Sequence, residues 1–470
     1  MHEGLLRAAL WTAEDAAEAT GGRLIGADSW LATGLSIDTR SLQPGDLFIA
    51  LQDSRDGHDF VGAAFAKGAA AALVSRGDLM GAAPGPLLFV EDTLEALRAL
   101  ARAARARSRA RRAAITGSVG KTSVKEALAA ALRLAGATHA AAKSFNNHIG
   151  VPLTLAQLPR DAAFGVFEIG MNHRGEIAPL SGLVAPDLAM ITTVAGVHLE
   201  ALGSIETIAL EKSDLYAGLA GGTALVPIDA PHADILLAAA KNHAGRVVRF
   251  GRGEGAEARL LSFAMDGEGS SAEAELFGRR LSYRIGAPGA PWAGNGLLVI
   301  AAAAELTGSP EPALEILAKL EPAAGRGAAR RIEAALGAFT LVDDAYNASP
   351  VSMAAALETL AARQPGPGGR RIAALGDMLE LGPEEFALHA GLAEPIARAG
   401  VDLVFAAGPR MQSLWAALPS ERQGAYAADA DSLIPHVVGS LRAGDIILIK
   451  GSNGSRMSRL VGALEALAAE

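Results

Sequence analysis

The sequence predicts an α/β protein of three domains. These are a small N-terminal α/β module (1–110), a central, mostly parallel sheet with a phosphate-binding loop (111–324) and a C-terminal, Rossmann-like doubly wound domain (325–470). The length of 470 residues is too great for one ordinary core, at roughly 150 residues per domain. In the last two segments apolar strand-like runs alternate with helical patterns, which is typical of parallel sheets. Polar residues follow several of these strands directly, at the sheet edge where α/β proteins bind ligands.

The composition narrows the classes of function. With 42 Lys and Arg against 51 Asp and Glu, the net charge is −9, so we expect no general binding of nucleic acid, which needs a basic face. The arginine-rich stretch 102–112 has helical spacing and is interpreted as a solvated helix face. The chain has no cysteine, which excludes disulfides and thiolate metal sites.

The apolar pattern indicates no membrane insertion. The N-terminus lacks the layout of a signal peptide, and no uncharged apolar run approaches the ~20 residues that span a bilayer. We therefore expect a soluble, cytoplasmic protein, and we expect it to be a monomer.

The first segment mixes short strands with helices. "LSIDTRSLQPGDLFIAL" (35–51) predicts two strands joined by a turn at Pro44 and Gly45. "DGHDFVGAAFAKGAAAALVS" (56–75) predicts a loop, a helix that ends near Gly68 and a strand. No catalytic cluster is evident in this segment.

The second segment opens with "AAITGSVGKTSVKEAL" (113–128), which is typical of a phosphate-binding loop with unusual spacing. The commonest nucleotide loop has four residues between its first glycine and the Gly-Lys pair. Here only Ser118 and Val119 separate Gly117 from Gly120. A strand before the loop and a helix after it favour phosphate binding over a simple glycine turn.

The loop residues suit a nucleoside triphosphate. Glycines let backbone N–H groups approach phosphate oxygens, and the following helix offers its N-terminus. Lys121 supplies a positive charge, and Thr122 can either hold Mg²⁺ or cap the helix.

Further strands at 163–170, 187–194 and 223–228 bring more polar groups to the same edge. Glu168 ends an apolar strand, where a carboxylate needs a partner; a hard cation, a salt bridge or a helix cap would each provide one. His198 follows the third strand as a candidate metal ligand or a polar loop residue. By its sequence alone, Lys212 is at least as readily interpreted as a solvated helix lysine as it is as a functional residue.

A weakly β-patterned stretch (251–286) and an Ala-rich helix (293–306) close the second segment. The third segment repeats the α/β pattern, with buried strands predicted within 338–350, 370–382 and 445–457. Asp343 and Asp344 end one of these strands, as ligand contacts or in a cap or turn. Lys450 ends another, where it could reach a phosphate or a carboxylate. Arg326 lies at the junction of the second and third segments, where it can reach a γ-phosphate on domain closure or merely pack.

With these residues assembled, the chain resembles the Mur ligase family over essentially its full length. The loop "TGSVGKTS" matches the family's ATP loop, which accounts for its short spacing. The other matching motifs are "SIDTR" (36–40), "DGHDF" (56–60), "KSFNNHIGVPLTL" (143–155), "DDAYNASP" (343–350), "GDMLELG" (376–382) and "KGSNGSRM" (450–457).

The resemblance implies a reaction. The motifs are most similar to those of the members that join D-alanyl-D-alanine to UDP-N-acetylmuramoyl-tripeptide, with ATP and two Mg²⁺ ions as cofactors. The terminal carboxylate of the tripeptide would attack the γ-phosphate to give an acyl phosphate, and the amino group of the dipeptide would then displace phosphate. The resemblance does not specify whether the tripeptide ends in meso-diaminopimelate or lysine, or how strict the dipeptide specificity is.

The resemblance also implies roles for single residues. Lys121, His198, Lys212 and Arg326 would be catalytic, and Lys212 matches a lysine that is carbamylated in several members. The ATP contacts would be Gly117, Ser118, Val119, Gly120, Lys121, Thr122, Ser123, Asn295 at the adenine, Arg326, Asp344 and Tyr346. The metal ligands would be Thr122 and Glu168 for one ion, and His198 and Lys212 for the other. The substrate contacts would be Asp38, Thr39, Arg40 and His58 at the UDP end, Asn146 and Asn147 near the muramoyl-peptide, and Asn347 and Lys450.

Four positions depart from the family pattern. Ser349 stands where Asn is common, Pro291 where His is frequent, Thr39 where Ser is usual and Asn453 where many relatives have Arg. The rival interpretations are a ligase for another amino acid, a folylpolyglutamate or cyanophycin-type enzyme, and a P-loop switch NTPase that hydrolyses ATP without an acceptor. "GDMLELG" and "DDAYNASP" argue against the ligase rivals, and the separate "KGS" turn argues against a switch.

Overall fold

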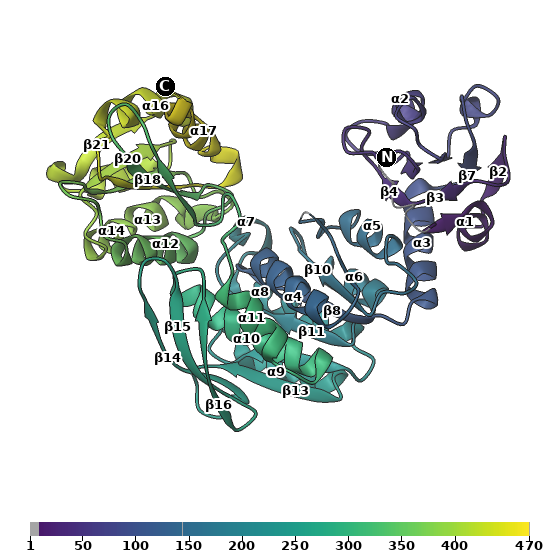
Figure 1. Cartoon of the computed structure of the whole chain (residues 1–470), viewed down its shortest axis with the longest axis horizontal. Coiled ribbons are helices and arrows are strands. Elements are labelled where there is room, and N and C mark those ends of the chain that lie inside the picture. Colours follow the sequence, from purple (N-terminus) through teal and green to yellow (C-terminus); the bar gives the residue numbers. More distant parts are fainter. Residues whose placement is uncertain (1–8, 143, 470) are drawn as a thin grey trace, which may run out of the picture.

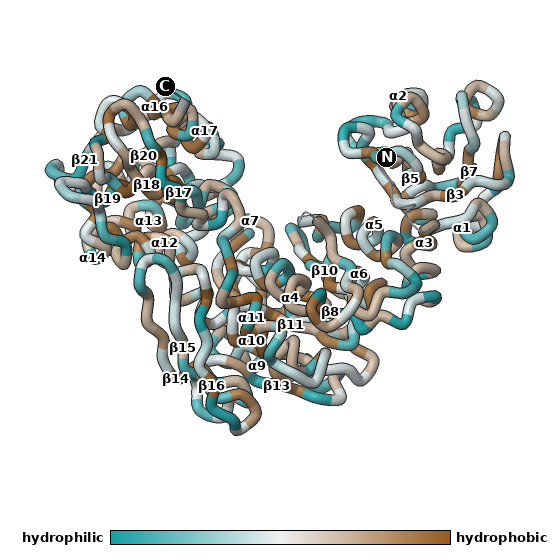
Figure 2. The backbone as a smooth tube through the Cα atoms, viewed as in Figure 1, coloured by the Kyte–Doolittle hydropathy of each residue, from teal (hydrophilic) through white to brown (hydrophobic). Residues whose placement is uncertain are grey.

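The computed structural model describes residues 9–142 and 144–469. Three α/β regions follow one another along the chain and form a wide V, with the central region at its base (Figure 1). Apolar residues are concentrated in the strands and on the helix faces that pack against them (Figure 2). The predicted α/β fold class is confirmed. Lys143, in the motif 143–155, lies outside the described residues.

The N-terminal region is built on a sheet with the strand order β2-β7-β6-β5-β4. The strands are β2 (Arg23–Ile25), β4 (Gly34–Ser36), β5 (Asp46–Ile49), β6 (Ala71–Val74) and β7 (Leu87–Phe89). The strands β1 (Trp11–Thr12) and β3 (Leu31–Ala32) form a separate pair, and the helices are α1 (Ala13–Thr20), α2 (Val61–Ala66) and α3 (Thr93–Arg107), with 3₁₀ turns η1 (Gly57–Phe60) and η2 (Gly77–Leu79).

The connection between β4 and β5 differs from the prediction of two strands joined by a turn. The two strands are parallel, so residues 37–45 must return along the strands, and Pro44 and Gly45 only lead into β5. Because β4, β5 and β6 run parallel, their carboxyl ends share one edge of the sheet.

The N-terminal and central regions share one continuous apolar core. It runs from Trp11 through α3 to the central helix α5 (Gly150–Ala156). The indole Nε1 of Trp11 donates to the carbonyl of Ala156 at 3.0 Å. Helix α3 begins at the cap Asp92 and carries residues 102–107 of the arginine-rich stretch, whose alanines face this core. The prediction of a solvated face is wrong for two of its arginines, because Arg105 donates to the Leu183 carbonyl and Arg107 stacks on the Trp11 ring at 3.7 Å. The two regions are therefore firmly docked.

The central region contains a sheet with the order β16-β15-β14-β13-β12-β11-β8-β10-β9. Its strands are β8 (Arg111–Thr116), β9 (Thr138–Ala140), β10 (Phe164–Glu168), β11 (Leu188–Ile191), β12 (Thr223–Pro227), β13 (Arg246–Gly251), β14 (Ala258–Met265), β15 (Ser270–Leu276) and β16 (Arg279–Ile285). In this order, every neighbouring pair from β14 to β9, including those of β8, is parallel. The pairs β14–β15 and β15–β16 are antiparallel.

Helices cover both faces of the central sheet. Alternate residues of β8, such as Ala114 and Ile115, belong to two different apolar clusters, one on each face. One face is covered by α5, α6 (Ile177–Val184), α8 (Ile205–Ser213) and α9 (Ala233–His243), and the other by α4 (Lys121–Ala135), α10 (Ala290–Thr307) and α11 (Glu311–Ala318). The short α7 (Leu199–Leu202) and η3 (Asp214–Gly218) complete this region.

The C-terminal region is a second doubly wound sheet with the order β17-β18-β22-β19-β20-β21. Its strands are β17 (Ala328–Ile332), β18 (Phe339–Asp344), β19 (Arg371–Gly376), β20 (Leu403–Ala407), β21 (Gln423–Ala427) and β22 (Ile446–Lys450). All pairs are parallel except β17 with β18.

Two apolar clusters sandwich the C-terminal sheet. One contains α12 (Pro350–Ala362), α14 (Ala393–Arg398) and α15 (Met411–Ala417), next to α13 (Glu385–Ala390), and the other contains α16 (Ala430–Ser440) and α17 (Ser458–Ala466). The 3₁₀ turns are η4 (Gly382–Glu384), η5 (Ser420–Arg422), η6 (Asn453–Ser455) and η7 (Leu467–Ala469). The domain boundaries near 110 and 324 fall between sheets and stay a prediction. In the described part of the chain, no helix combines the length and apolar character that a bilayer crossing requires.

Candidate active site

The phosphate-binding loop connects β8 to α4 and needs its two glycines. Gly117 has φ +151°, and a Cβ there would lie 1.9 Å from the Thr192 hydroxyl. Gly120 has φ +86°, and a Cβ there would lie 2.7 Å from Nδ2 of Asn295. A side chain at either position would meet backbone strain and a clash. Because the Asn295 side chain lies this close to Gly120, Asn295, which is predicted at the adenine, is directly beside the loop.

The segment that follows β11 holds this loop in shape. Ser118 N donates to the Thr193 carbonyl at 2.9 Å, and the Ser118 hydroxyl donates to the Ala195 carbonyl at 2.9 Å. Thr192 donates to the Val119 carbonyl at 2.6 Å. The loop is thus preorganised, with the N-terminus of α4 open to an anion.

Lys121 is folded onto the loop. Its Nζ donates to the Gly117 carbonyl at 2.7 Å. Burial lowers the pKa of Lys121, and the nearby Glu168 carboxylate opposes that shift. A cation with so little water around it interacts strongly with phosphate.

The predicted first metal site is assembled from oxygen atoms. Thr122 Oγ1 donates to Glu168 Oε2 at 2.9 Å, and Asn146 Nδ2 donates to Glu168 Oε1 at 2.8 Å. Glu168 is buried, and both of its carboxylate oxygens accept hydrogen bonds from these uncharged groups. A hydroxyl and a carboxylate this close fit a hard cation such as Mg²⁺, which prefers oxygen ligands.

Arg326 reaches the loop from the hinge. Its Nη2 donates to Thr122 Oγ1 at 3.2 Å, and its guanidinium carbon lies 4.0 Å from the centre of the Tyr346 ring. Asp343 fixes the hinge by accepting from Gly325 N at 2.7 Å. The two strand-end aspartates therefore differ, because neighbouring strand residues point to opposite sides. Asp343 holds the backbone, while Asp344 lines a cavity.

Lys450 and Asp344 form a pair at the C-terminal side of that cavity. Their charged atoms are 2.7 Å apart, and Lys450 Nζ also donates to the Asn347 carbonyl at 2.9 Å. Burial raises the pKa of Asp344, and Lys450 opposes the shift.

The cavity has a volume of about 540 Å³ and lies between the central and C-terminal domains. It brings together most of the predicted site. The predicted residues that line it are Ser118, Val119, Gly120, Lys121, Thr122, Ser123, Asn146, Asn147, Glu168, His198, Asn295, Arg326, Asp344, Tyr346, Asn347 and Lys450. Gly117 and Lys212 lie outside its lining.

Lys212 is buried on α8, so the solvated-lysine alternative is wrong. Burial lowers its pKa well below the usual range, the positive charge of Lys121 adds to this, and Glu211 opposes it. Glu211 is occupied elsewhere, since it accepts from Gly175, Glu176 and Ile177 N at the start of α6. Across residues 9–142 and 144–469, the side-chain amine of Lys212 has no hydrogen-bond or ion-pair partner.

His198 is the N-cap residue of α7, with φ +56°, and its Nδ1 contacts the carboxylate of Glu380 in the C-terminal domain. Burial lowers the pKa of His198, and Glu380 opposes the shift. Among the described residues, no group of three or more His, Asp and Glu side chains is placed to hold a metal. The second ion therefore stays a prediction that depends on His198 and on a modified Lys212.

Two of the predicted or departing residues have structural roles. Asn147 Oδ1 accepts from Gly150 N at 2.8 Å, at the start of α5. Ser349 caps α12 in a reciprocal arrangement with Ser352, which accounts for a hydroxyl residue at this position. Pro291 and Asn453 line the cavity.

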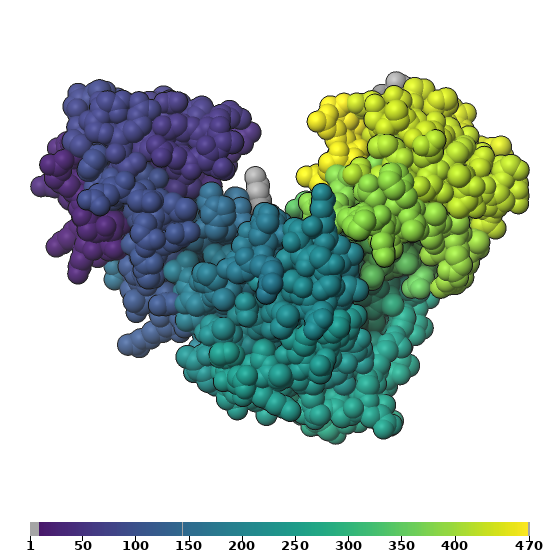
Figure 3. All heavy atoms as spheres, turned by 180° about the vertical axis from the view of Figure 1, so that it is seen from behind, coloured from purple at the N-terminus to yellow at the C-terminus, as the bar shows by residue number. Residues whose placement is uncertain are grey.

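A second hollow, of about 950 Å³, lies between the N-terminal and central domains. Figure 3 shows the purple N-terminal and yellow C-terminal domains standing apart above the teal central domain. Asp38 lines this hollow together with Ser36 and, from the central domain, Arg160. Arg40 pairs with Asp38 at 2.7 Å and is exposed beside it, while the Thr39 carbonyl accepts from Lys67.

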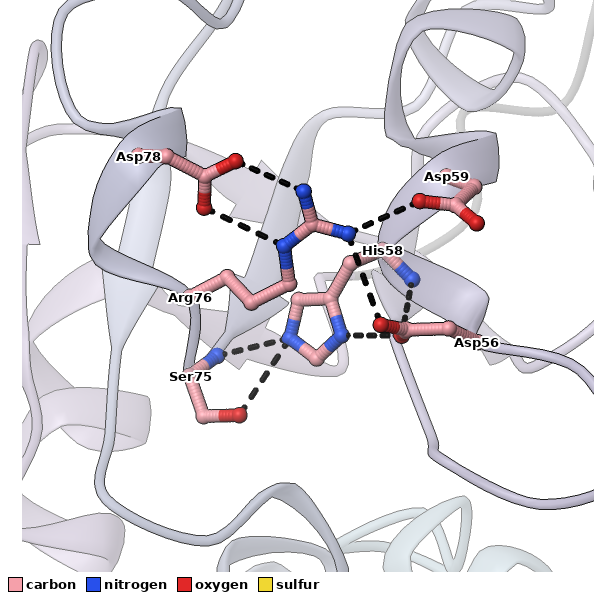
Figure 4. Close-up of polar contacts among 6 residues, drawn as sticks. All are labelled: Asp56, His58, Asp59, Ser75, Arg76 and Asp78. Atoms are coloured by element: carbon pink, nitrogen blue, oxygen red, sulfur yellow. Dashed lines mark hydrogen bonds and ion pairs between the residues drawn. The ribbon is translucent and has the colours of Figure 1, made fainter.

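His58 does not have the predicted geometry of a substrate contact (Figure 4). Its side chain is fully buried. Asp56 Oδ1 lies 2.6 Å from Nδ1, and Ser75 N donates to Nε2 at 2.9 Å. The ring is therefore the Nδ1–H tautomer with both nitrogens occupied. It joins the loop after β5 to the end of β6, which is a structural role.

The neighbouring Arg76 lies among three carboxylates, those of Asp56, Asp59 and Asp78 (Figure 4). Hydrogen bonds to Asp78 and then Asp59 are the largest causes that raise its pKa. These ion pairs connect the segment after β6, which carries Arg76, to the loop that carries His58.

We expect His58→Ala to lower the free energy of unfolding by about 2–3 kcal/mol, because Asp56 and Ser75 N each lose a buried partner. Urea unfolding measures this. The control is His173→Ala, which removes a 75% exposed side chain. Equal stability of the two variants would contradict the structural role.

The sequence pattern predicts no role for Glu380, and it leaves the role of Asp343 open. Glu380 lies inside the quoted motif "GDMLELG", but its partner His198 is 182 residues away, so no local signal could reveal the contact. For Asp343, the sequence did contain a signal. Two adjacent aspartates at a strand end cannot both face the site, so one of them was expected to have a structural role.

Comparisons with known proteins bear on this geometry. Three family models match successive parts of the chain: Mur ligase family, catalytic domain (32–105), Mur ligase middle domain (115–303) and Mur ligase, glutamate ligase domain (330–453). The UDP-N-acetylmuramoyl-tripeptide–D-alanyl-D-alanine ligase of Escherichia coli is 34% identical over 452 residues, which is 94% of this chain and 96% of the relative. The chain belongs to the Mur ligase family.

Solved structures of Mur ligases agree with the fold. A crystal structure of MurF from Acinetobacter baumannii superposes with a TM-score of 0.84 at 27% identity, covering 97% of this chain and 99% of that one. The MurF ligase of Thermotoga maritima in complex with ADP gives 0.75 at 25% identity, covering 93% and 98%. The cavity between the central and C-terminal domains is thus the candidate active site of a Mur ligase.

Proposed function

We propose that this Mur ligase uses ATP to join D-alanyl-D-alanine to the terminal carboxylate of UDP-N-acetylmuramoyl-tripeptide, a step of peptidoglycan precursor synthesis. The observation that carries the proposal is the cavity lined on one side by the loop 118–123 and on the other by Asp344, Asn347 and Lys450. A ligase must bring a nucleotide and two further substrates together, and a cavity between domains does this. The similarity to the E. coli ligase, over nearly all of both chains, supplies the substrates.

In the first step, a carboxylate oxygen of the tripeptide attacks the γ-phosphorus of ATP. The bond from that phosphorus to the β–γ bridging oxygen breaks, giving an acyl phosphate and ADP. Lys121, Arg326 and the loop amides stabilise the charge that accumulates on the phosphoryl oxygens. Bound Mg²⁺ would supply additional charge neutralisation, held by Thr122 and Glu168 and, for a second ion, by His198 and a modified Lys212.

In the second step, the amino group of the dipeptide attacks the acyl carbon. Phosphate leaves, an amide bond forms and the ammonium intermediate loses a proton. Lys450, beside Asp344 at the C-terminal side, is placed to attract a carboxylate of the dipeptide. Because the acyl phosphate is hydrolysable, the C-terminal domain must also exclude water while the site is loaded.

The hollow at the N-terminal domain is the proposed site of the uridine diphosphate. It is separate from the ATP cavity, and Asp38 and Ser36 at the end of β4 line it. Ligands of parallel sheets bind beyond such strand ends. A cytoplasmic location and a monomeric state are part of this proposal.

Phosphate release with Mg-ATP tests the proposal when one substrate is omitted at a time. We expect release to require both UDP-N-acetylmuramoyl-tripeptide and D-alanyl-D-alanine, with the pentapeptide product visible by mass spectrometry. Parallel assays with tripeptides ending in meso-diaminopimelate or lysine would identify the third residue. Equal ATP hydrolysis without either substrate would instead indicate a switch NTPase.

A further inference from the structure

The contact between His198 and Glu380 joins two domains at the rim of the ATP cavity. His198 follows β11 in the central domain, and Glu380 follows β19 in the C-terminal domain; both line the cavity. A second bond accompanies the contact, since Glu200 N donates to the Glu380 carbonyl at 3.3 Å. Both residues have positive φ, +56° and +63°. Non-glycine residues seldom adopt this conformation, so the surrounding structure must hold it in place.

The C-terminal domain holds the Glu380 loop rigidly. Met378 N donates to His389 Nε2 at 2.9 Å, and Leu379 N donates to the Ser452 hydroxyl at 2.9 Å. Met378 and Leu381, on either side, are buried. The Glu380 side chain is 58% exposed at the tip of this loop. It is therefore presented to the central domain from a fixed backbone.

The position of this carboxylate determines the state of the His198 ring. A neutral imidazole carries its proton on one nitrogen only. With Glu380 at Nδ1, the proton stays on Nδ1 as the donor, and Nε2 keeps its lone pair. In the described part of the chain Nε2 has no hydrogen-bond partner, so that lone pair is free for a ligand. A carboxylate behind a ligating histidine fixes its tautomer and raises its basicity.

We propose that Glu380 is a positioning residue of the ligase reaction: from the C-terminal domain it fixes the Nδ1–H tautomer of His198 and so presents Nε2 to the nucleotide site. The role in catalysis rests on the proposed function, whereas the tautomer does not. Because the two partners belong to different domains, His198 is set correctly only when the C-terminal domain is docked. Glu380 thereby links the position of that domain to the state of the central site.

The test combines Glu380→Gln with a charge control. Gln keeps the shape but loses the charge, so Nδ1–H is no longer favoured. Glu384→Gln removes an exposed charge four residues away, on the same domain. Long-range proton–nitrogen-15 spectra of the full chain report which ring nitrogen of His198 is protonated, and His198→Gln assigns the signal. Thermal unfolding confirms that the variants are folded.

We expect the wild type and Glu384→Gln to show Nδ1–H, and Glu380→Gln to show a mixture of tautomers. We also expect kcat to fall about 10- to 100-fold in Glu380→Gln, the usual effect of losing such a partner, with little change in the KM of UDP-N-acetylmuramoyl-tripeptide. A wild-type Nε2–H tautomer, an unchanged tautomer in Glu380→Gln, or a tautomer shift with unchanged kcat would each overturn the proposal. If the wild type lacked ligase activity, the proposed function would fail, but the tautomer result would still stand.

Discussion

Replacing Lys121 by methionine is expected to lower kcat/KM for ATP at least ~1000-fold, as for the loss of a key charge in phosphoryl transfer, while the protein stays folded. The ammonium group lies among the loop carbonyls, 2.7 Å from that of Gly117, at the start of α4. ATP would bring several negative charges to this point. The partly buried position of Lys121 means that water cannot replace the lost charge.

The expected stability of this variant follows from the same burial. Burial lowers the pKa of Lys121, because the folded structure removes water from around its charge. Methionine fills a similar volume without that charge, so the thermal midpoint should not fall. The control is Lys319→Met, which removes a 71% exposed lysine paired with Glu315. Near-wild-type turnover of Lys121→Met would contradict the assignment of the loop.

The sequence predicted the site where it depends on local pattern and sheet geometry. The glycines, the preceding strand and the following helix predicted the loop, and the structure forms it between β8 and α4. The resemblance implied that Glu168 and Thr122 share one site, and they lie together because β8 and β10 are parallel neighbours whose carboxyl ends coincide. Arg326 was predicted at the hinge, within reach of the nucleotide, and its guanidinium contacts Thr122 of the loop.

The sequence could not predict features that depend on packing between distant segments. "DGHDF" does not show whether His58 faces solvent or the interior, since its second partner, Ser75, follows β6 and lies 17 residues away. The Pro-Gly pair before β5 suggested a direct turn, whereas pairing with β4 in parallel required a longer return. The helix that carries Lys212 is covered by other elements, and nothing in its own sequence shows this.

Replacing Lys212 by methionine is expected to stabilise the protein and to lower its activity strongly. Lys212 is buried without a partner in the described residues, so the folded state bears the cost of removing an amine from water. Methionine should raise the free energy of unfolding by about 1–4 kcal/mol, as when buried charged groups are replaced by apolar ones. Turnover should fall at least ~100-fold if the amine is the precursor of a metal-binding carbamate, by analogy with the loss of a metal-site partner.

The pH dependence of this stability difference has a definite sign. An unfolded lysine titrates near ~10.4, whereas burial places the pKa of Lys212 well below that in the folded protein. Between the two values the unfolded chain binds the additional proton, so wild-type stability falls as the pH decreases. Below the folded pKa the loss is complete and constant. The advantage of Lys212→Met should therefore be smallest above the unfolded pKa, grow as the pH falls, and reach its full size below the folded pKa.

Urea unfolding at several pH values in bicarbonate-free buffer measures this advantage, with Lys241→Met, an exposed lysine of α9, as the control. The lowered pKa also keeps more of the amine neutral, which is the form that reacts with carbon dioxide. Adding bicarbonate should consequently raise wild-type activity and leave Lys212→Met unchanged. A variant with full activity would remove Lys212 from the metal site. A variant less stable than the wild type at neutral pH would show that the buried amine has a stabilising partner in the folded protein.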